Sequence, residues 1–319
     1  MRKMKKESRE LINIARALSD RPDLVQGAGG NLSVKLDAKR MLIKASGFMF
    51  DELSETKGFV VVDYKKLHTR YSTKKAFNEK KESEFLLSCA ENTNTRPSME
   101  AGFHAFLGKY VLHTHPVYTN VLSCAKDGER IALGIAEHIG IDAAFLKYAN
   151  PGPELAVAVA GLVKKRSRAP SVIFLGNHGL IVSGKTVSEV LALHERINKE
   201  MRDLLQLTKY PRVGIKAGGK NFKSKYLRGV SLVALKKTVL FPDQAVFCAD
   251  SGKIGIVRGE VVYRTSEKEA RVLEELLHAW SYILSSIKKL NMTPLMLNAR
   301  IVRYLTHMEA EKHRKNVIR

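Results

Sequence analysis

The sequence predicts an α/β fold in which helices flank an antiparallel or mixed sheet. Strand-like and helix-like patterns alternate over roughly the first two thirds of the 319-residue chain. Several successive strands are separated by short turns and not by crossover segments, which favours antiparallel neighbours. With 45% hydrophobic residues, the chain can bury a substantial core as one large domain or as two unequal ones.

Hydrophobic periodicity defines the elements of the first domain, which we expect to span residues 1–208. Its helices repeat apolar residues at helical spacing, and its strands are short apolar runs bounded by turn residues. The predicted helices are residues 5–18, 100–107, 117–125, 155–166 and 187–207. The predicted strands are residues 32–36, 40–44, the stretch after Tyr110, 171–175 and 180–182.

Residues 209–319 are predicted to form a basic linker and a smaller C-terminal α+β extension. The segment 209–228 contains seven Lys or Arg, three glycines and no acid, which is typical of a linker or an exposed loop. Strand patterns follow near 245–248, 253–257 and 261–263. Ser266 and Glu269 fit a capping box that opens an apolar-striped helix over 272–287. A final helix at 299–311 precedes a basic tail that we expect to be disordered.

The net charge of +22 and the pI near 9.9 raise nucleic-acid binding as a hypothesis. The basic residues are concentrated in 65–81, 164–168 and 209–228, segments with the appearance of insertions or linkers, and no strand interleaves them with aromatic residues. The pattern therefore favours a solvated basic surface over nucleic acid as a partner. Such a surface also attracts phosphorylated metabolites.

The sequence is typical of a soluble protein of the reducing cytoplasm. Its three cysteines, Cys89, Cys124 and Cys248, are odd in number and widely separated, so they indicate neither a disulfide framework nor a thiolate zinc site. No uncharged apolar run has membrane-spanning length, and we therefore expect no membrane partner.

Three histidines form the main candidate site. His113 and His115 are one residue apart on an apolar strand, so both side chains fall on one face. His178 follows a second apolar strand in a tight Asn-His-Gly turn. Three neutral imidazoles with one open position are the ligand set of a catalytic zinc, although such a pair can also be two satisfied core histidines. Upstream, Glu100 is close enough in sequence to share the pocket and to transfer protons.

The glycine-containing loop at 26–33 is either an anion site or only a tight turn. It offers backbone amides without Cβ obstruction, followed by the donors Asn31 and Ser33, which suits a phosphate. A helix precedes the loop and a strand follows it, the reverse of a dinucleotide fingerprint. Ser46 and Gly47, at the end of the next strand, offer a hydroxyl and an amide for the same anion.

Residues 179–186 match the phosphate-loop pattern G-x-x-x-x-G-K-[ST] but do not indicate a nucleotide site. Leu180, Ile181 and Val182 form an apolar, partly β-branched run that favours an extended strand over a loop wrapped around an anion. We therefore expect Lys185 and Thr186 to begin the next helix.

Five separated motifs resemble the class II aldolase/adducin family in order and content, over residues 5–207. Within the family, the sequence looks most like the aldolase portion of fused rhamnulose-phosphate aldolase/short-chain dehydrogenase proteins. It shares with them a Phe-Pro-Asp segment, here Phe241-Pro242-Asp243. We expect no dehydrogenase portion in this chain. The motifs are Gly30-Asn31-Leu32-Ser33, Ala45-Ser46-Gly47, Pro97-Ser98-Met99-Glu100, His113-Thr114-His115-Pro116 and Asn177-His178-Gly179.

The resemblance implies a three-layer α/β/α sandwich around a mostly antiparallel sheet, assembled as a homotetramer with sites at subunit interfaces. It implies zinc, or another divalent metal, held by His113, His115 and His178, with Glu100 as the acid/base. The residues implied to contact a substrate phosphate are Gly30, Asn31, Ser46, Gly47 and Ser98. Met99 departs from the hydroxyl residue that several phosphate-binding members have at this place.

The function expected from these residues is a metal-dependent lyase of carbohydrate metabolism. It would cleave a ketose phosphate, a small phosphorylated sugar, by retro-aldol chemistry through a metal-stabilised enediolate. The same site also suits a sugar-phosphate epimerase or dehydratase. The remaining alternative is a non-catalytic, adducin-like interaction module, which the three histidines and Glu100 disfavour.

Overall fold

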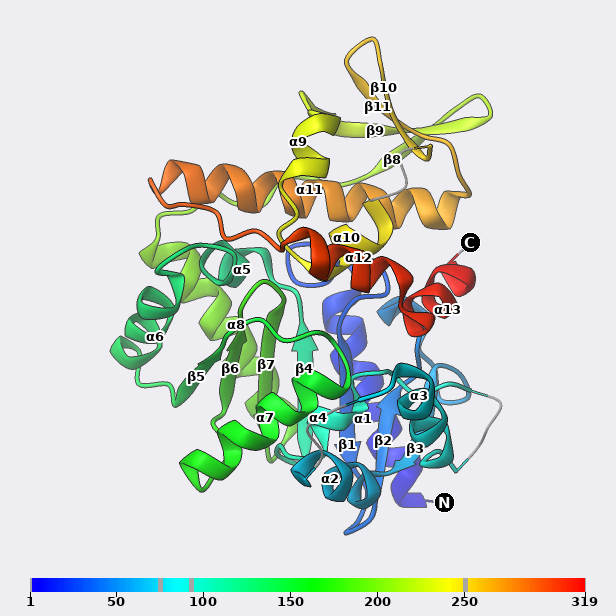
Figure 1. Ribbon diagram of the computed structural model, residues 1–319, viewed down its shortest axis with the longest axis vertical. Coiled ribbons are helices and arrows are strands. Elements are labelled where there is room, and N and C mark those ends of the chain that lie inside the picture. Colours follow the sequence, from blue (N-terminus) through cyan, green and yellow to red (C-terminus); the bar gives the residue numbers. More distant parts are fainter. Residues whose placement is uncertain (1, 74–76, 92–94, 249–251, 319) are drawn as a thin grey trace.

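The computed structural model describes residues 2–73, 77–91, 95–248 and 252–318. Its main feature is a seven-stranded sheet with helices on both faces (Figure 1). The strands, in spatial order, are β3 (Phe59–Asp63), β2 (Arg40–Lys44), β1 (Asn31–Lys35), β4 (Tyr110–Thr114), β7 (Gly179–Gly184), β6 (Val172–Leu175) and β5 (Ala143–Leu146). Within this sheet only β5 and β6 pair in parallel, so the predicted mostly antiparallel α/β/α arrangement is confirmed.

Side-chain alternation along the strands builds an apolar core on each face of the sheet. On β4, Leu112 belongs to one core and Val111 to the other, as the two-residue period of a strand requires. The first core is covered by α1 (Arg2–Ser19), α5 (Val117–Ser123), α6 (Gly128–His138) and α8 (Val187–Leu204). The second is covered by α2 (Tyr64–Thr73), α3 (Glu79–Ser88), α4 (Ala101–His104) and α7 (Pro153–Arg166).

The C-terminal extension is a second sheet with five helices, packed against one end of the large sheet (Figure 1). Its strand order is β10 (Ile254–Val257), β11 (Glu260–Tyr263), β9 (Asn221–Arg228) and β8 (Ile215–Gly218). Its helices are α9 (Leu232–Lys237), α10 (Pro242–Cys248), α11 (Glu267–Lys289), α12 (Ala299–His307) and α13 (Glu309–Ile318). The first apolar core continues from the large sheet into the extension without a break. The predicted domain boundary between residues 208 and 209 therefore stays a prediction.

The helix α11 contacts both α5 and α10, and its predicted apolar stripe is buried between them. The Ser266 hydroxyl accepts a hydrogen bond from the Glu269 backbone N–H at 3.3 Å, as predicted for the N-cap. The Glu269 side chain, in contrast, bonds to Thr265 and Lys253. Only the N-cap half of the predicted capping box is therefore confirmed.

Two predictions for the extension are wrong. Residues 245–248, read as a strand, belong to α10, all of whose residues are buried. A fully buried apolar run has no polar face and therefore lacks the period that distinguishes a helix from a strand. The segment 209–228, read as a linker or exposed loop, contains the β8–β9 hairpin. Three of its basic residues form ion pairs with a carboxylate on another strand. Glu260 of β11 pairs with Lys216, Lys223 and Arg228.

The basic tail is also not disordered up to residue 318. The predicted helix 299–311 ends at His307, and α13 begins at Glu309 after a break at Met308. Helix α13 packs near α3, where the Glu309 backbone N–H donates to the Glu79 carboxylate at 2.5 Å. This tertiary contact brings the tail back to the large sheet, beside the turn that follows β2.

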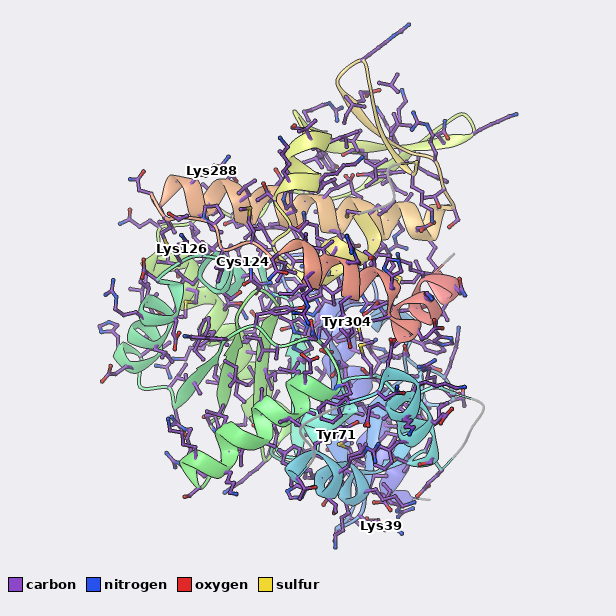
Figure 2. The ribbon with its side chains drawn as sticks, viewed as in Figure 1. Lys39, Tyr71, Cys124, Lys126, Lys288 and Tyr304 are labelled. Atoms are coloured by element: carbon purple, nitrogen blue, oxygen red, sulfur yellow. The ribbon has the colours of Figure 1, made fainter. Side chains whose placement is uncertain are left out.

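Long basic side chains cover the outside of the molecule. Lys39, Lys126 and Lys288 lie at its periphery in Figure 2, whereas Cys124 is buried. All three cysteines are buried and free. Among the described residues, no helix combines the length and the apolar character needed to cross a membrane.

Candidate metal centre and catalytic site

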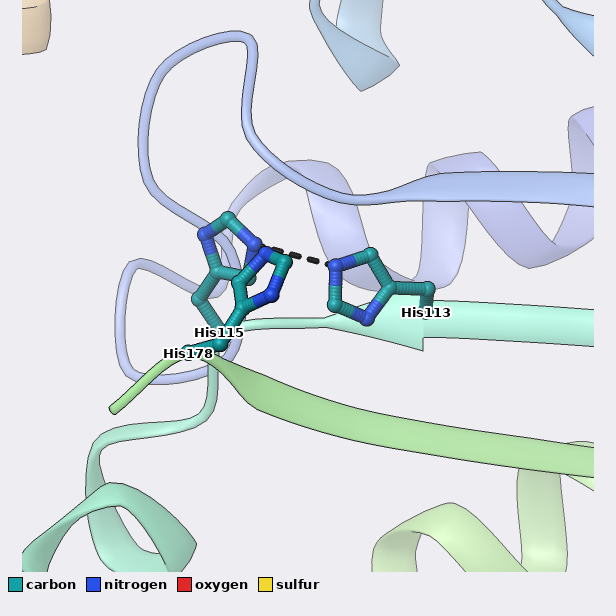
Figure 3. A group of neighbouring side chains, drawn as sticks. All are labelled: His113, His115 and His178. Carbon is teal, nitrogen blue, oxygen red and sulfur yellow. Dashed lines mark hydrogen bonds between the residues drawn. The ribbon is translucent and has the colours of Figure 1, made fainter. Parts of the chain in front are cut away.

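Three imidazoles converge where β4 ends and β7 begins (Figure 3). His113 is on β4, His115 follows directly after that strand, and His178 lies in the turn between β6 and β7. The Nε2 atoms of His113 and His115 are 3.2 Å apart, and the ring centroid of His178 lies 4.9 and 5.2 Å from theirs. One nitrogen from each ring falls within 4.8 Å of the others. The tertiary structure therefore brings the predicted ligands together.

The outer contacts of His113 and His115 leave the inner nitrogens of both rings available. His113 Nδ1 lies 3.0 Å from the carbonyl oxygen of Leu180, and His115 Nδ1 lies 3.3 Å from Asp243 Oδ2. A proton on each Nδ1 leaves a lone pair on Nε2, where the rings meet. Burial lowers the pKa of His113 well below its usual value and that of His178 to about 3. His113 and His178 are thus neutral donors, and a set of three imidazole nitrogens fits a divalent metal such as zinc.

Glu100 lies against the same three rings. Its Oε2 is 3.6 Å from His113 Nε2, and its Oε1 is 3.4 Å from His178 Nε2. Asn31 donates to Oε2 at 2.7 Å, while Oε1 is buried without a hydrogen-bond partner. Burial raises the pKa of Glu100 to about 7. A carboxyl group with such a pKa can both give and take a proton near neutral pH.

The five predicted phosphate contacts all line one cavity beside the histidines. They come from the loop before β1, from the turn after β2 and from the segment before α4. These residues are Gly30, Asn31, Ser46, Gly47 and Ser98. Glu100, His115 and His178 line the same cavity. The acid, two of the histidines and the candidate anion site therefore face one space.

Two of the histidines outside the predicted set, His104 and His194, support the site from the protein interior. His104 Nδ1 bonds to the Ser33 hydroxyl at 2.7 Å, and its Nε2 bonds to the Asn31 side chain. The bond from His104 fixes the side-chain amide of Asn31, which donates to Glu100. His194 Nε2 bonds to the Thr114 hydroxyl at 2.7 Å, between the two histidines of the pair. Both side chains are fully buried.

Four charged side chains in the cavity were not predicted from the sequence as site residues. Lys44, at the end of β2, is 2% exposed and donates to the Phe48 carbonyl at 2.6 Å, and burial lowers its pKa to about 7. Asp243, Glu311 and Arg314 come from α10 and α13 of the extension. The Phe-Pro-Asp segment was a sequence signal for Asp243. For Glu311 and Arg314 the sequence offered only a basic tail.

The residues 179–184 form strand β7, and they pair with β4 and β6 along their length. Thr186 caps α8 by accepting from the Glu189 backbone N–H at 3.2 Å. The phosphate-loop pattern is therefore a strand followed by a helix cap, as expected.

Helix α13 fills much of the candidate site. Between the histidines and α13 remains a cavity of about 30 Å³, which suits about one water molecule. The Val317 side chain lies so close to Gly47 that a Cβ on this glycine would meet it at 2.8 Å. A larger cavity of about 370 Å³ shares Met99, Pro151 and Ala310 with the first.

Comparisons with known proteins agree with this geometry. Residues 9–204 match the family model described as the class II aldolase and adducin N-terminal domain. The chain is 33% identical over 105 residues to the uncharacterized oxidoreductase YuxG of Bacillus subtilis (strain 168). That match covers 32% of this chain and only 15% of the length of YuxG.

Among solved structures, the fold is similar to the N-terminal class II aldolase domain of a conserved protein from Thermoplasma acidophilum. That similarity has a TM-score of 0.51 at 25% identity and covers 61% of this chain and 92% of the other. An L-fuculose 1-phosphate aldolase gives a TM-score of 0.44 at 21% identity, over 62% of this chain and 84% of the other.

Proposed function

We propose that this chain, which belongs to the class II aldolase and adducin family, is a metal-dependent lyase that cleaves a ketose phosphate by retro-aldol chemistry. One observation carries the proposal. A buried carboxyl group, Glu100, lies within 3.6 Å of rings whose neutral nitrogens converge on one point, in a cavity that also contains a candidate anion site. This combination suits carbon–carbon cleavage next to a carbonyl group.

His113, His115 and His178 would hold a zinc or another divalent ion. Such a metal supplies Lewis-acid stabilisation of the negative charge that develops on the ketose oxygens. The protein fixes the ligands through the backbone carbonyl of Leu180 and the carboxylate of Asp243.

Glu100 would carry the proton at carbon. After cleavage, the nucleophilic carbon of the ketose fragment takes up a proton, and the Glu100 carboxyl is the acid placed to donate it. In the direction of synthesis, the carboxylate removes that proton. Asn31 orients the carboxyl through its 2.7 Å hydrogen bond to Oε2.

The phosphate would bind to polar groups that line the same cavity. Ser46, Ser98 and Asn31 offer side-chain donors there, and Gly30 and Gly47 offer backbone without a Cβ. Lys44 adds a buried cation to the same wall. These donors suit the phosphate group of a small phosphorylated sugar.

Entry of that substrate requires α13 to move. The present cavity of about 30 Å³ is far too small for a sugar phosphate, and Val317 lies over Gly47. The adjoining cavity of about 370 Å³ offers space for the remainder of the sugar once Ala310 is displaced. A homotetrameric assembly, which the family resemblance implies, is part of the same proposal.

Two other functions use the same residues differently. An epimerase or a dehydratase would begin with the same charge stabilisation at the ketose oxygens and differ only in the later bond change. An adducin-like interaction module would need neither the neutral imidazoles nor the buried carboxyl. The tertiary convergence of all four groups favours an enzyme over that module.

The test has two parts. Purified protein should contain about one divalent ion per chain by elemental analysis, and His113→Ala should lose it while the exposed His138→Ala should not. Ketose 1-phosphates are then screened for release of an aldehyde and dihydroxyacetone phosphate. Epimer formation without aldehyde would replace the lyase by an epimerase. Metal content below about half an ion per chain would contradict a metal-dependent enzyme.

A further inference from the structure

We propose that Asp243 and Arg314, both in the C-terminal extension, are positioning residues for His115, so that the extension completes the metal centre. The inference uses the metal site of the proposed function but not its reaction. It assigns a role to residues 209–319 that lies outside the matched family domain, which ends at residue 204.

The first contact joins α10 to the histidine. Asp243 Oδ2 lies 3.3 Å from His115 Nδ1, and the aspartate is 3% exposed. Oδ2 has no hydrogen-bond partner among the described residues, so this carboxylate oxygen is placed to take the Nδ1 proton and leave the lone pair on Nε2. The Nε2 atom is the one that faces His113 at 3.2 Å. Asp243 thus selects the tautomer and the ring orientation that a metal requires.

The backbone of the glycine loop leaves room for this contact. A Cβ on Gly29 would lie 2.7 Å from Asp243 Oδ2 and 2.8 Å from His115 Nδ1. Both distances are shorter than any normal contact of a carbon atom with these groups. A side chain at position 29 would therefore separate the aspartate from the histidine.

The second contact joins α13 to Asp243. The Arg314 guanidinium donates to Asp243 Oδ1, and its other end lies 3.2 Å from Glu311 Oε1. The guanidinium also lies over the ring of Phe247, 5.0 Å from its centroid, one turn along α10 from the aspartate. Arg314 is held on three sides and in turn holds the carboxylate toward His115.

The charges explain why both residues are needed. A buried carboxylate without a cation is costly, and it would turn away or become protonated. Arg314 supplies the cation, and the metal-facing histidine supplies the second partner. Loss of such an outer partner lowers metal affinity by about 10-fold to 100-fold in other metalloproteins.

The experiment measures the affinity of the full chain for Zn²⁺ by competition with a chromophoric chelator. Asp243→Ala should weaken binding by about 10-fold to 100-fold, and Asp243→Asn, which keeps an acceptor oxygen, by less. Arg314→Gln should also weaken binding, and Arg314→Lys should retain more affinity than Arg314→Gln. In the Asp243→Ala background, Arg314→Gln should add nothing, because the arginine acts through the aspartate.

Matched controls are the exposed Asp127→Asn and Arg300→Gln, which should bind Zn²⁺ as the wild type does. If Asp243→Ala does not fold, Asp243→Asn and Arg314→Gln provide the same comparison. Unchanged affinity in the Asp243 variants, with one ion bound per wild-type chain, would overturn this inference alone. An additive effect of Arg314→Gln would overturn the role of the arginine. A wild type that binds no Zn²⁺ would overturn both this inference and the proposed metal-dependent lyase.

Discussion

Burial prepares the individual side chains of the site for their chemistry. It penalises the charged form of a group, so His113 and His178 become neutral donors and the pKa of Glu100 rises to about 7. Asp243 is the exception. Burial also opposes its ionisation, but Arg314 and His115 together hold its pKa below the usual value. The site therefore combines one carboxyl that can exchange its proton with one that stays charged.

At the scale of the residue, Glu100→Gln should keep bound metal and lose turnover. The amide can still accept the Asn31 hydrogen bond but cannot donate a proton to carbon, so we expect kcat to fall by about 10²-fold to 10⁴-fold. Steady-state kinetics and metal content on the same preparation test this. Glu84→Gln, on the exposed side of α3, is the matched control. Retained turnover would remove Glu100 from the mechanism.

At the scale of the element, α13 matters most, because it connects the extension to the predicted anion site. Lys268 of α11 donates to the carbonyl of Val317 at 3.4 Å and bonds to Glu52 at 2.9 Å, which ties α13 and the segment after β2 to the same side chain. The helix is short and basic, and few of its residues are buried. Short elements with few buried apolar contacts open at low free-energy cost.

Gly47→Ala should weaken the docking of α13. The glycine has a φ of +82°, which costs alanine roughly 1 kcal/mol or more, and the added Cβ would lie 2.8 Å from Val317. Faster amide hydrogen exchange in α13 and a lower free energy of unfolding are the expected results. Val317→Ala in the same chain should relieve only the clash with the two Cγ atoms, because the Val317 Cβ, itself 2.8 Å from the added carbon, remains. A variant with unchanged exchange in α13 would show that this contact does not hold the helix.

At the scale of the whole molecule, the extension also reaches the glycine loop. Glu275 of α11 accepts a hydrogen bond from the Gly27 backbone N–H at 2.7 Å, and burial raises its pKa to about 7. Because the folded protein holds this proton more tightly than the unfolded chain, the contribution of Glu275 to stability is full below about pH 4.5. It is lost as the pH rises toward 7.

Glu275→Gln should therefore remove part of the pH dependence of stability. The amide keeps an acceptor for Gly27 and has no charge to bury, so the variant should lose less stability than the wild type between about pH 4.5 and 7. Thermal unfolding across this range measures the difference, with the exposed Glu267→Gln as a control. Parallel curves for wild type and variant would contradict the assignment.

The sequence by itself determined most of the domain that matches the family, because local signals there agree with the tertiary structure. The strands around His113 and His178 are apolar runs that end in turn residues, and alternation placed the two histidines of the pair on one face. The rejection of the phosphate-loop pattern followed from β-branched residues alone. Separated motifs in the right order then indicated Glu100 and the anion contacts, all of which the fold brings to one cavity.

Only the tertiary structure decided what the extension does at this site. The residues of α10 are buried on every side, so their sequence lacks the period of a helix. Arg314 of α13 pairs with Asp243 of α10, in a distant segment of the chain. Arg314 is 71 residues from Asp243 and 199 from His115, and no local pattern records such a contact. The chemistry of His113, His115 and His178 can be read from residue types and spacing. Their outer partners are set by long-range packing, which depends on the whole folded chain.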